Sequence, residues 1–123
     1  MNKDSLYAFY GSLRRGMSNY ELYKEALEYQ FSARLKGFKL YSRGQYPCVI
    51  KSNVTDSVVV EVFQVINLDF EIQIHNLEMG EGYIYEEIGI DEKKVGMYVY
   101  ENSENFQEVI EGDWVTFFRN RVI

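Results

Sequence analysis

The stretch from Val58 to Ile66 constrains the possible fold more strongly than any other part of this sequence. It is rich in β-branched residues, which favour a strand, and its only polar members are Glu61 and Gln64. Because neither face of such a strand is polar throughout, both faces are expected to be buried. The chain therefore has to provide either layers on both sides of a sheet or a sheet that curls into a barrel wall.

The remaining elements are expected to be shorter strands and two helices. Ser18 and Glu21 form a capping-box pattern that predicts a helix over residues 19–29, with Leu22 and Ala26 facing inward. A second helix is expected from an Asn67 cap to Gly80, and further strands at residues 6–10, 33–41, 84–90 and 95–101, the last two joined as a hairpin through residues 91–94.

These elements predict a mixed α+β fold, in which about six strands form a small, curled, β-barrel-like sheet with two main helices. The length suits a single domain spanning residues 1–123. Pro47, the only proline, lacks a backbone donor and therefore predicts a turn or a sheet edge. The tail at residues 112–118 is apolar enough to pack down, with Trp114 covering an edge.

The composition argues against several classes of function. A net charge of −6 disfavours binding to nucleic acids and to anionic membranes. No segment approaches the ~20 apolar residues of a membrane span, and the first apolar run is too short for a signal peptide. The single cysteine, Cys48, allows no internal disulfide and suits a reducing cytoplasm. One histidine and one cysteine fall short of a structural zinc site, and we expect neither metal nor cofactor.

The most distinctive segment is residues 9–16, which read Phe-Tyr-Gly-Ser-Leu-Arg-Arg-Gly. An apolar strand is followed by a glycine turn and a short hydroxyl side chain. Successive backbone N–H groups in such a turn can bind a carboxylate or another anion, and Gly11 would let a ligand approach the backbone closely. The alternative is a plain turn that ends a strand.

This segment resembles the N-terminal signature of gamma-glutamylcyclotransferase-like proteins, and the likeness is closest to gamma-glutamylamine cyclotransferase and its small bacterial relatives. Further matches follow in the same order along nearly the whole chain. They are Tyr46-Pro47-Cys48-Val49-Ile50, Glu61-Val62-Phe63, Ile74-His75-Asn76-Leu77-Glu78 and Gly112-Asp113-Trp114. In these motifs Glu78 takes the position of the family's catalytic acid.

The resemblance implies an intramolecular aminolysis, in which the α-amine of a γ-glutamyl group attacks its own γ-carbonyl and releases 5-oxoproline and an amine. It implies Glu78 as the general acid and base, a role that suits a partly buried carboxylate with a raised pKa. It also implies a substrate site for a small molecule, formed by Tyr10, Gly11, Ser12, Leu13 and Tyr83.

Other interpretations of these residues remain open. Glu78 could be a solvated glutamate at a helix end. Glu61, the rival carboxylate, is interpreted as a structural residue paired with a neighbouring donor, and neither His75 nor Cys48 is expected to be catalytic. Tyr85 departs from the family, many members of which have Arg there. The protein could therefore be a non-catalytic module that binds γ-glutamyl or carboxylate ligands, or an interaction protein that uses its many aromatic residues.

Overall fold

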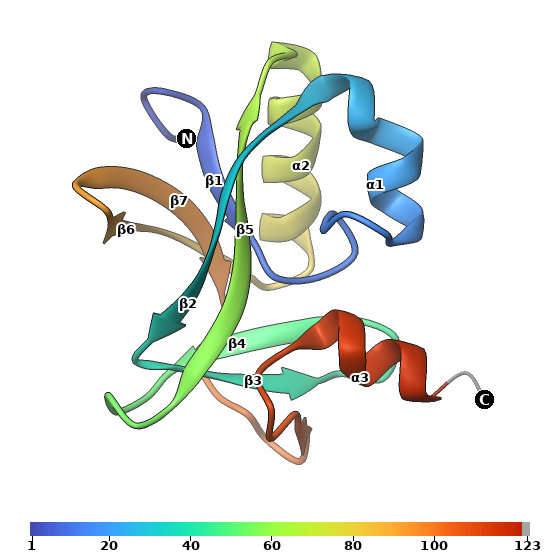
Figure 1. The fold of residues 1–123 in the computed structure, drawn as a ribbon, viewed down its shortest axis with the longest axis vertical. Coiled ribbons are helices and arrows are strands. Elements are labelled where there is room, and N and C mark those ends of the chain that lie inside the picture. Colours follow the sequence, from blue (N-terminus) through green and yellow to red (C-terminus); the bar gives the residue numbers. More distant parts are fainter. Residues whose placement is uncertain (122–123) are drawn as a thin grey trace.

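The computed structural model describes residues 1–121, which form two β-sheets and three α-helices (Figure 1). The strands are β1 (Leu6–Phe9), β2 (Leu27–Lys36), β3 (Phe38–Ser42), β4 (Pro47–Lys51), β5 (Ser57–Val65), β6 (Ile84–Ile90), β7 (Lys93–Val99) and β8 (Gln107–Glu108). The helices are α1 (Ser18–Tyr23), α2 (Leu68–Gly80) and α3 (Trp114–Arg121), and a 3-10 turn, η1 (Lys24–Ala26), follows α1.

The larger sheet has the strand order β2-β5-β1-β7-β6, and the smaller sheet has the order β4-β3-β8. Strand β5 is antiparallel to both β1 and β2, whereas β1 and β7 are parallel. The larger sheet curls but does not close into a barrel, since β2 and β6 remain its edges. The mixed α+β fold with a curled sheet is therefore confirmed.

Strand β5 is buried on both faces, as its sequence predicts. Val58, Val60 and Val62 pack in one core together with residues of the smaller sheet and α3. Phe63 and Val65 pack in a second core, which is covered by α2. The strand therefore separates two apolar layers, and this arrangement explains why it has almost no polar side chains.

The helix expected over residues 19–29 is wrong in its second half. Helix α1 ends at Tyr23, and Leu22, expected to face inward, is 73% exposed. Strand β2 begins at Leu27 because this segment pairs with β5 along its length, and pairing with a buried strand outweighs local helix propensity. The capping box is also wrong, because Met17 is the N-cap and its side chain makes no cap hydrogen bond.

The strand expected over residues 33–41 is divided at Gly37, whose φ of 90° lets the chain turn from the larger sheet into the smaller one. Pro47 lies at an edge, as expected, but begins strand β4. The hairpin β6–β7 is confirmed, with a turn at Asp91 and Glu92 that is shorter than the four residues expected. The tail packs down as expected, and Trp114 begins α3 with its side chain buried in the core.

Helix α2 begins and ends as its sequence predicts. The side chain of Asn67 accepts a hydrogen bond from the backbone N–H of Phe70 at 3.0 Å, which caps the helix. The helix ends at Gly80, and Gly82 follows with a φ of 92°. This sharp end places the last turn of α2 beside the segment that follows β1.

Candidate active site

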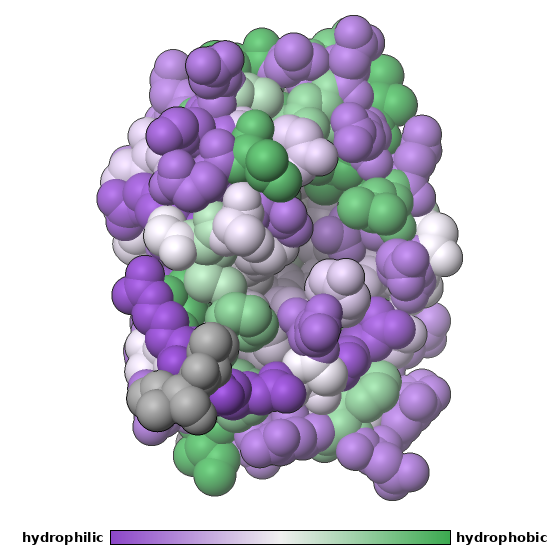
Figure 2. Space-filling model, turned by 90° about the vertical axis from the view of Figure 1, so that its right-hand side faces the viewer, coloured by the Kyte–Doolittle hydropathy of each residue, from purple (hydrophilic) through white to green (hydrophobic). Residues whose placement is uncertain are grey.

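A cavity of about 330 Å³ lies between the segment after β1, the β3–β4 turn and the last turn of α2. Figure 2 shows a hollow near the centre of the face that carries α1 and α3. All six site residues that were predicted from the sequence line this cavity: Tyr10, Gly11, Ser12, Leu13, Glu78 and Tyr83. The structure thus brings together residues from two segments that are far apart in the chain.

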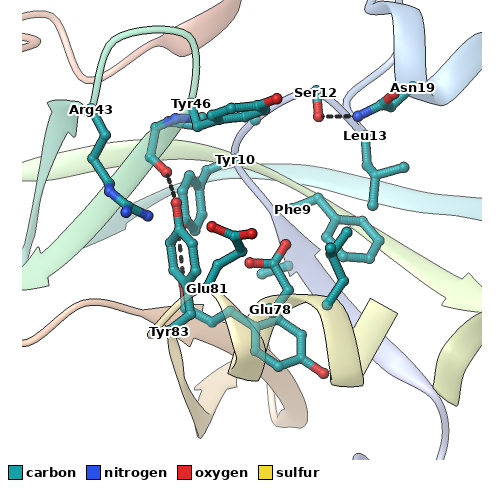
Figure 3. Close-up of a pocket in the computed structure, with 15 residues that line it drawn as sticks. Phe9, Tyr10, Ser12, Leu13, Asn19, Arg43, Tyr46, Glu78, Glu81 and Tyr83 are labelled. Atoms are coloured by element: carbon teal, nitrogen blue, oxygen red, sulfur yellow. Dashed lines mark hydrogen bonds between the residues drawn. The ribbon is translucent and has the colours of Figure 1, made fainter. Parts of the chain in front are cut away.

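Glu78 projects from the last turn of α2 into the cavity, beside the carboxylate of Glu81 (Figure 3). The Glu78 side chain is partly buried. Burial raises its pKa to about 7, the negative charge of Glu81 adds to this increase, and Arg43 opposes it. A carboxyl group with this pKa can both accept and donate a proton near neutral pH.

Two side-chain hydrogen bonds hold the loop after β1 in place. The hydroxyl of Tyr10 donates to the carbonyl oxygen of Tyr98 at 2.6 Å, and the amide of Asn19 donates to Ser12 Oγ at 2.8 Å. Within residues 1–121, the backbone N–H groups of Gly11, Ser12 and Leu13 have no protein acceptor. Three unsatisfied donors along a cavity wall are suited to bind a carboxylate or a carbonyl oxygen.

Glycine at position 11 is required by a neighbouring side chain. A Cβ atom built on Gly11 would lie 2.7 Å from Cγ of Pro47, whose ring packs against the loop. Contact with Pro47 thus gives a structural reason for the glycine, and the expectation that Gly11 also lets a ligand approach the backbone stays a prediction.

Gly11→Ala is expected to lower the unfolding free energy by about 1–3 kcal/mol, since either the loop or the buried Pro47 ring has to move. Urea denaturation of both proteins measures this difference. A variant at Gly89, where an added Cβ meets no atom within 4 Å, is the matched control. Equal destabilisation of the two variants would contradict the role given to Pro47.

Glu61 is a structural residue and does not line the cavity. Its carboxylate accepts from Nε of Arg14 at 2.9 Å, and from the backbone N–H and Nε of Arg15, both at 3.0 Å. Arg14 is buried and also forms an ion pair with Asp113 at 2.8 Å. These contacts fix the end of the loop that begins at Tyr10, and they agree with the interpretation made from the sequence.

Tyr83 and Cys48 are both held in their protonated forms by burial. The hydroxyl of Tyr83 donates to the carbonyl oxygen of Pro47 at 2.6 Å, and burial raises its pKa to about 12. Burial also raises the pKa of Cys48 to about 11, so its thiol is not a nucleophile at neutral pH. His75 lies outside the cavity lining, with Nδ1 2.9 Å from the hydroxyl of Tyr98.

Sequence reasoning missed several residues that line the cavity. Arg43 and Tyr46 come from the β3–β4 turn, and Glu81 follows Glu78 by one helical turn. The spacing of Glu81 could have signalled that it shares a face with Glu78. Nothing in the local sequence indicates which way the side chain of Arg43 points.

The cavity thus combines a partly buried carboxyl group, whose pKa is raised to about 7, with the loop of residues 11–13. The chain matches the family model described as gamma-glutamyl cyclotransferase, AIG2-like, over residues 7–116, and it belongs to this family. A comparison with curated protein sequences finds no match.

Solved structures share the fold. An uncharacterised protein from Pyrococcus horikoshii has a TM-score of 0.78 and 23% identity, with 95% of each chain covered. An AIG2-like protein from Mus musculus has a TM-score of 0.59 and 15% identity, covering 80% of this chain and 77% of that one. A structure named gamma-glutamyl cyclotransferase has a TM-score of 0.56 and 19% identity, covering 84% of this chain and 68% of that one.

Within residues 1–121, none of the helices combines the length and the apolar character that crossing a membrane requires. In the same residues, His, Cys, Asp and Glu side chains form no group of three or more that could hold a metal ion.

Proposed function

We propose that this protein is a gamma-glutamyl cyclotransferase, which converts a γ-glutamyl amine or peptide to 5-oxoproline and a free amine. The bond that forms joins the α-nitrogen to the γ-carbonyl carbon, and the bond that breaks is the γ-amide bond. Two protons leave the attacking ammonium and two arrive on the departing nitrogen. The reaction therefore consumes no other reactant and returns Glu78 to its starting charge.

Glu78 carries the proton in this proposal. Its carboxylate takes a proton from the α-ammonium, which makes the nitrogen nucleophilic, and then gives a proton to the departing nitrogen. The N–H groups of Gly11, Ser12 and Leu13 bind the α-carboxylate or the carbonyl oxygen of the glutamyl group. Tyr10 and Tyr83 form walls of the site.

The observation that carries the proposal is the pKa of about 7 at Glu78, in the cavity that also contains the free N–H groups. A solvated glutamate at a helix end would have no such shift. The family match supports the same reaction class. The single, buried Cys48 suits the reducing cytoplasm, where we expect the protein to act as one domain.

The direct test is to incubate the protein with γ-glutamyl amines and γ-glutamyl dipeptides and to measure 5-oxoproline. We expect turnover of at least one substrate, with an equal amount of released amine. Saturable binding by calorimetry without any 5-oxoproline would instead identify a non-catalytic binding module. Neither binding nor turnover would leave an interaction protein as the remaining interpretation.

A further inference from the structure

Arg43 is the one cation that residues 1–121 contribute to the cavity lining. Its guanidinium lies 4.5 Å from the ring centroid of Tyr100, 5.4 Å from that of Tyr83 and 5.8 Å from that of Phe106. The aromatic rings hold the charge in place by cation–π contacts, which leave N–H groups of the guanidinium available.

No carboxylate in the described part of the chain forms an ion pair with Arg43. Its polar neighbour is the hydroxyl of Tyr83, which can accept from only part of the guanidinium. Other arginines of this protein differ, since Arg14 and Arg15 form ion pairs with Glu61. Arg43 is therefore held in a fixed position in the cavity lining, and its guanidinium is not paired with a carboxylate of the described residues.

The charges of the cavity limit what Arg43 can bind. Glu78 and Glu81 would repel a second anionic group of a ligand anywhere in the cavity except near Arg43, whose positive charge offsets the repulsion. In the view of Figure 3, Arg43 lies to the left of these two carboxylates and Ser12 lies to their upper right. A glutamyl group held at Ser12 with its γ-carbonyl at Glu78 would then place the departing amine on the Arg43 side of the cavity.

We propose that Arg43 is a specificity-determining residue that binds a carboxylate carried by the leaving amine. The preferred substrates are then γ-glutamyl amino acids or peptides, in preference to γ-glutamyl amines that have no carboxylate. This inference rests on the proposed cyclotransferase function. Because the contact is remote from the reacting atoms, it lowers KM more than it raises kcat.

The test compares γ-glutamylalanine with γ-glutamylethylamine, which lacks only the carboxylate, and with the neutral γ-glutamylalaninamide. We expect kcat/KM to favour γ-glutamylalanine by about tenfold, the size of a charge-assisted contact that is partly open to solvent. Arg43→Gln should remove this preference and Arg43→Lys should restore part of it. Arg34→Gln, an identical substitution outside the cavity, should keep it.

Each result decides between alternatives. If Arg43→Gln lowers kcat/KM equally for all three substrates and leaves the preference for γ-glutamylalanine intact, the inference is wrong, because loss of the Arg43 charge also raises the pKa of Glu78 and slows every substrate alike. If the wild-type protein turns over all three substrates equally, the inference is wrong while the proposed function stands. If no substrate gives 5-oxoproline, the proposed function itself fails. Should Arg43→Gln not fold, the preference of the wild-type protein still has to decrease at high ionic strength, because the contact is charged.

Discussion

Glu78→Gln is expected to lower kcat for 5-oxoproline formation by about 10²- to 10⁴-fold, which is the usual contribution of a general acid or base. Glutamine keeps the size and the hydrogen-bonding shape of the side chain but cannot accept the proton of the attacking ammonium. The measurement is the rate of 5-oxoproline release at saturating substrate. Turnover close to that of the wild type would rule out Glu78 as the acid–base group.

The pH dependence gives an independent check of the same role. Because the base has to be ionised, kcat/KM of the wild type should rise as the pH increases through about 7, the pKa of Glu78. Glu81→Gln is the matched control, since it removes a neighbouring carboxylate that raises this pKa. In that variant the midpoint should move to lower pH, while turnover stays far above that of Glu78→Gln.

Protein stability should change with pH in the opposite direction to activity. The pKa of Glu78 is raised in the folded state from 4.5 to about 7, so the folded state holds its proton more tightly than the unfolded state does. The fold therefore loses stability as the pH rises from about 4.5 to about 7 and Glu78 ionises in the partly buried site. Glu78→Gln should be spared this loss, so inactivity of the variant at alkaline pH cannot be attributed to unfolding.

The parts of the fold that could be predicted are those whose signals are local or uniform. Burial on both faces of β5 follows from its run of β-branched residues, and Asn67 caps α2 through a contact within one turn. The segment that begins at Leu27 could not be assigned correctly from its own sequence. Its pairing with β5, a strand that comes much later in the chain, decides its conformation.

The residues of the candidate site also divide into those that could be predicted from the sequence and those that could not. The motif at residues 9–16 and the context of Glu78 each carry a family resemblance, so the amino-acid sequence alone was enough to name both, and folding places them in one cavity. Arg43 could not be named in this way, because the direction of its side chain depends on its contacts with Tyr83, Tyr100 and Phe106, which come from other parts of the chain.

Glu61→Ala is expected to lower the unfolding free energy by about 3–5 kcal/mol, because it leaves a buried arginine without its main partner. Glu61 is 4% exposed and Arg14 is 7% exposed. Asp113 offsets only part of the charge of Arg14, since its carboxylate is partly open to solvent. The midpoint of urea denaturation, at an unchanged m-value, measures the loss.

Two further variants distinguish the loss of stability caused by breaking the buried ion pair from the effect of removing any negative charge. Glu21→Ala breaks the exposed ion pair with Lys24 and should leave the denaturation midpoint unchanged, because water screens that pair. Glu61→Gln keeps an oxygen that can accept from the backbone N–H of Arg15, so its stability should lie between those of the wild type and Glu61→Ala. The KM of Glu61→Gln should rise as well, because the contacts of Glu61 with Arg14 and Arg15 hold the end of the loop that lines the cavity. A Glu61→Ala protein as stable as Glu21→Ala would show that the loop is held by its backbone alone.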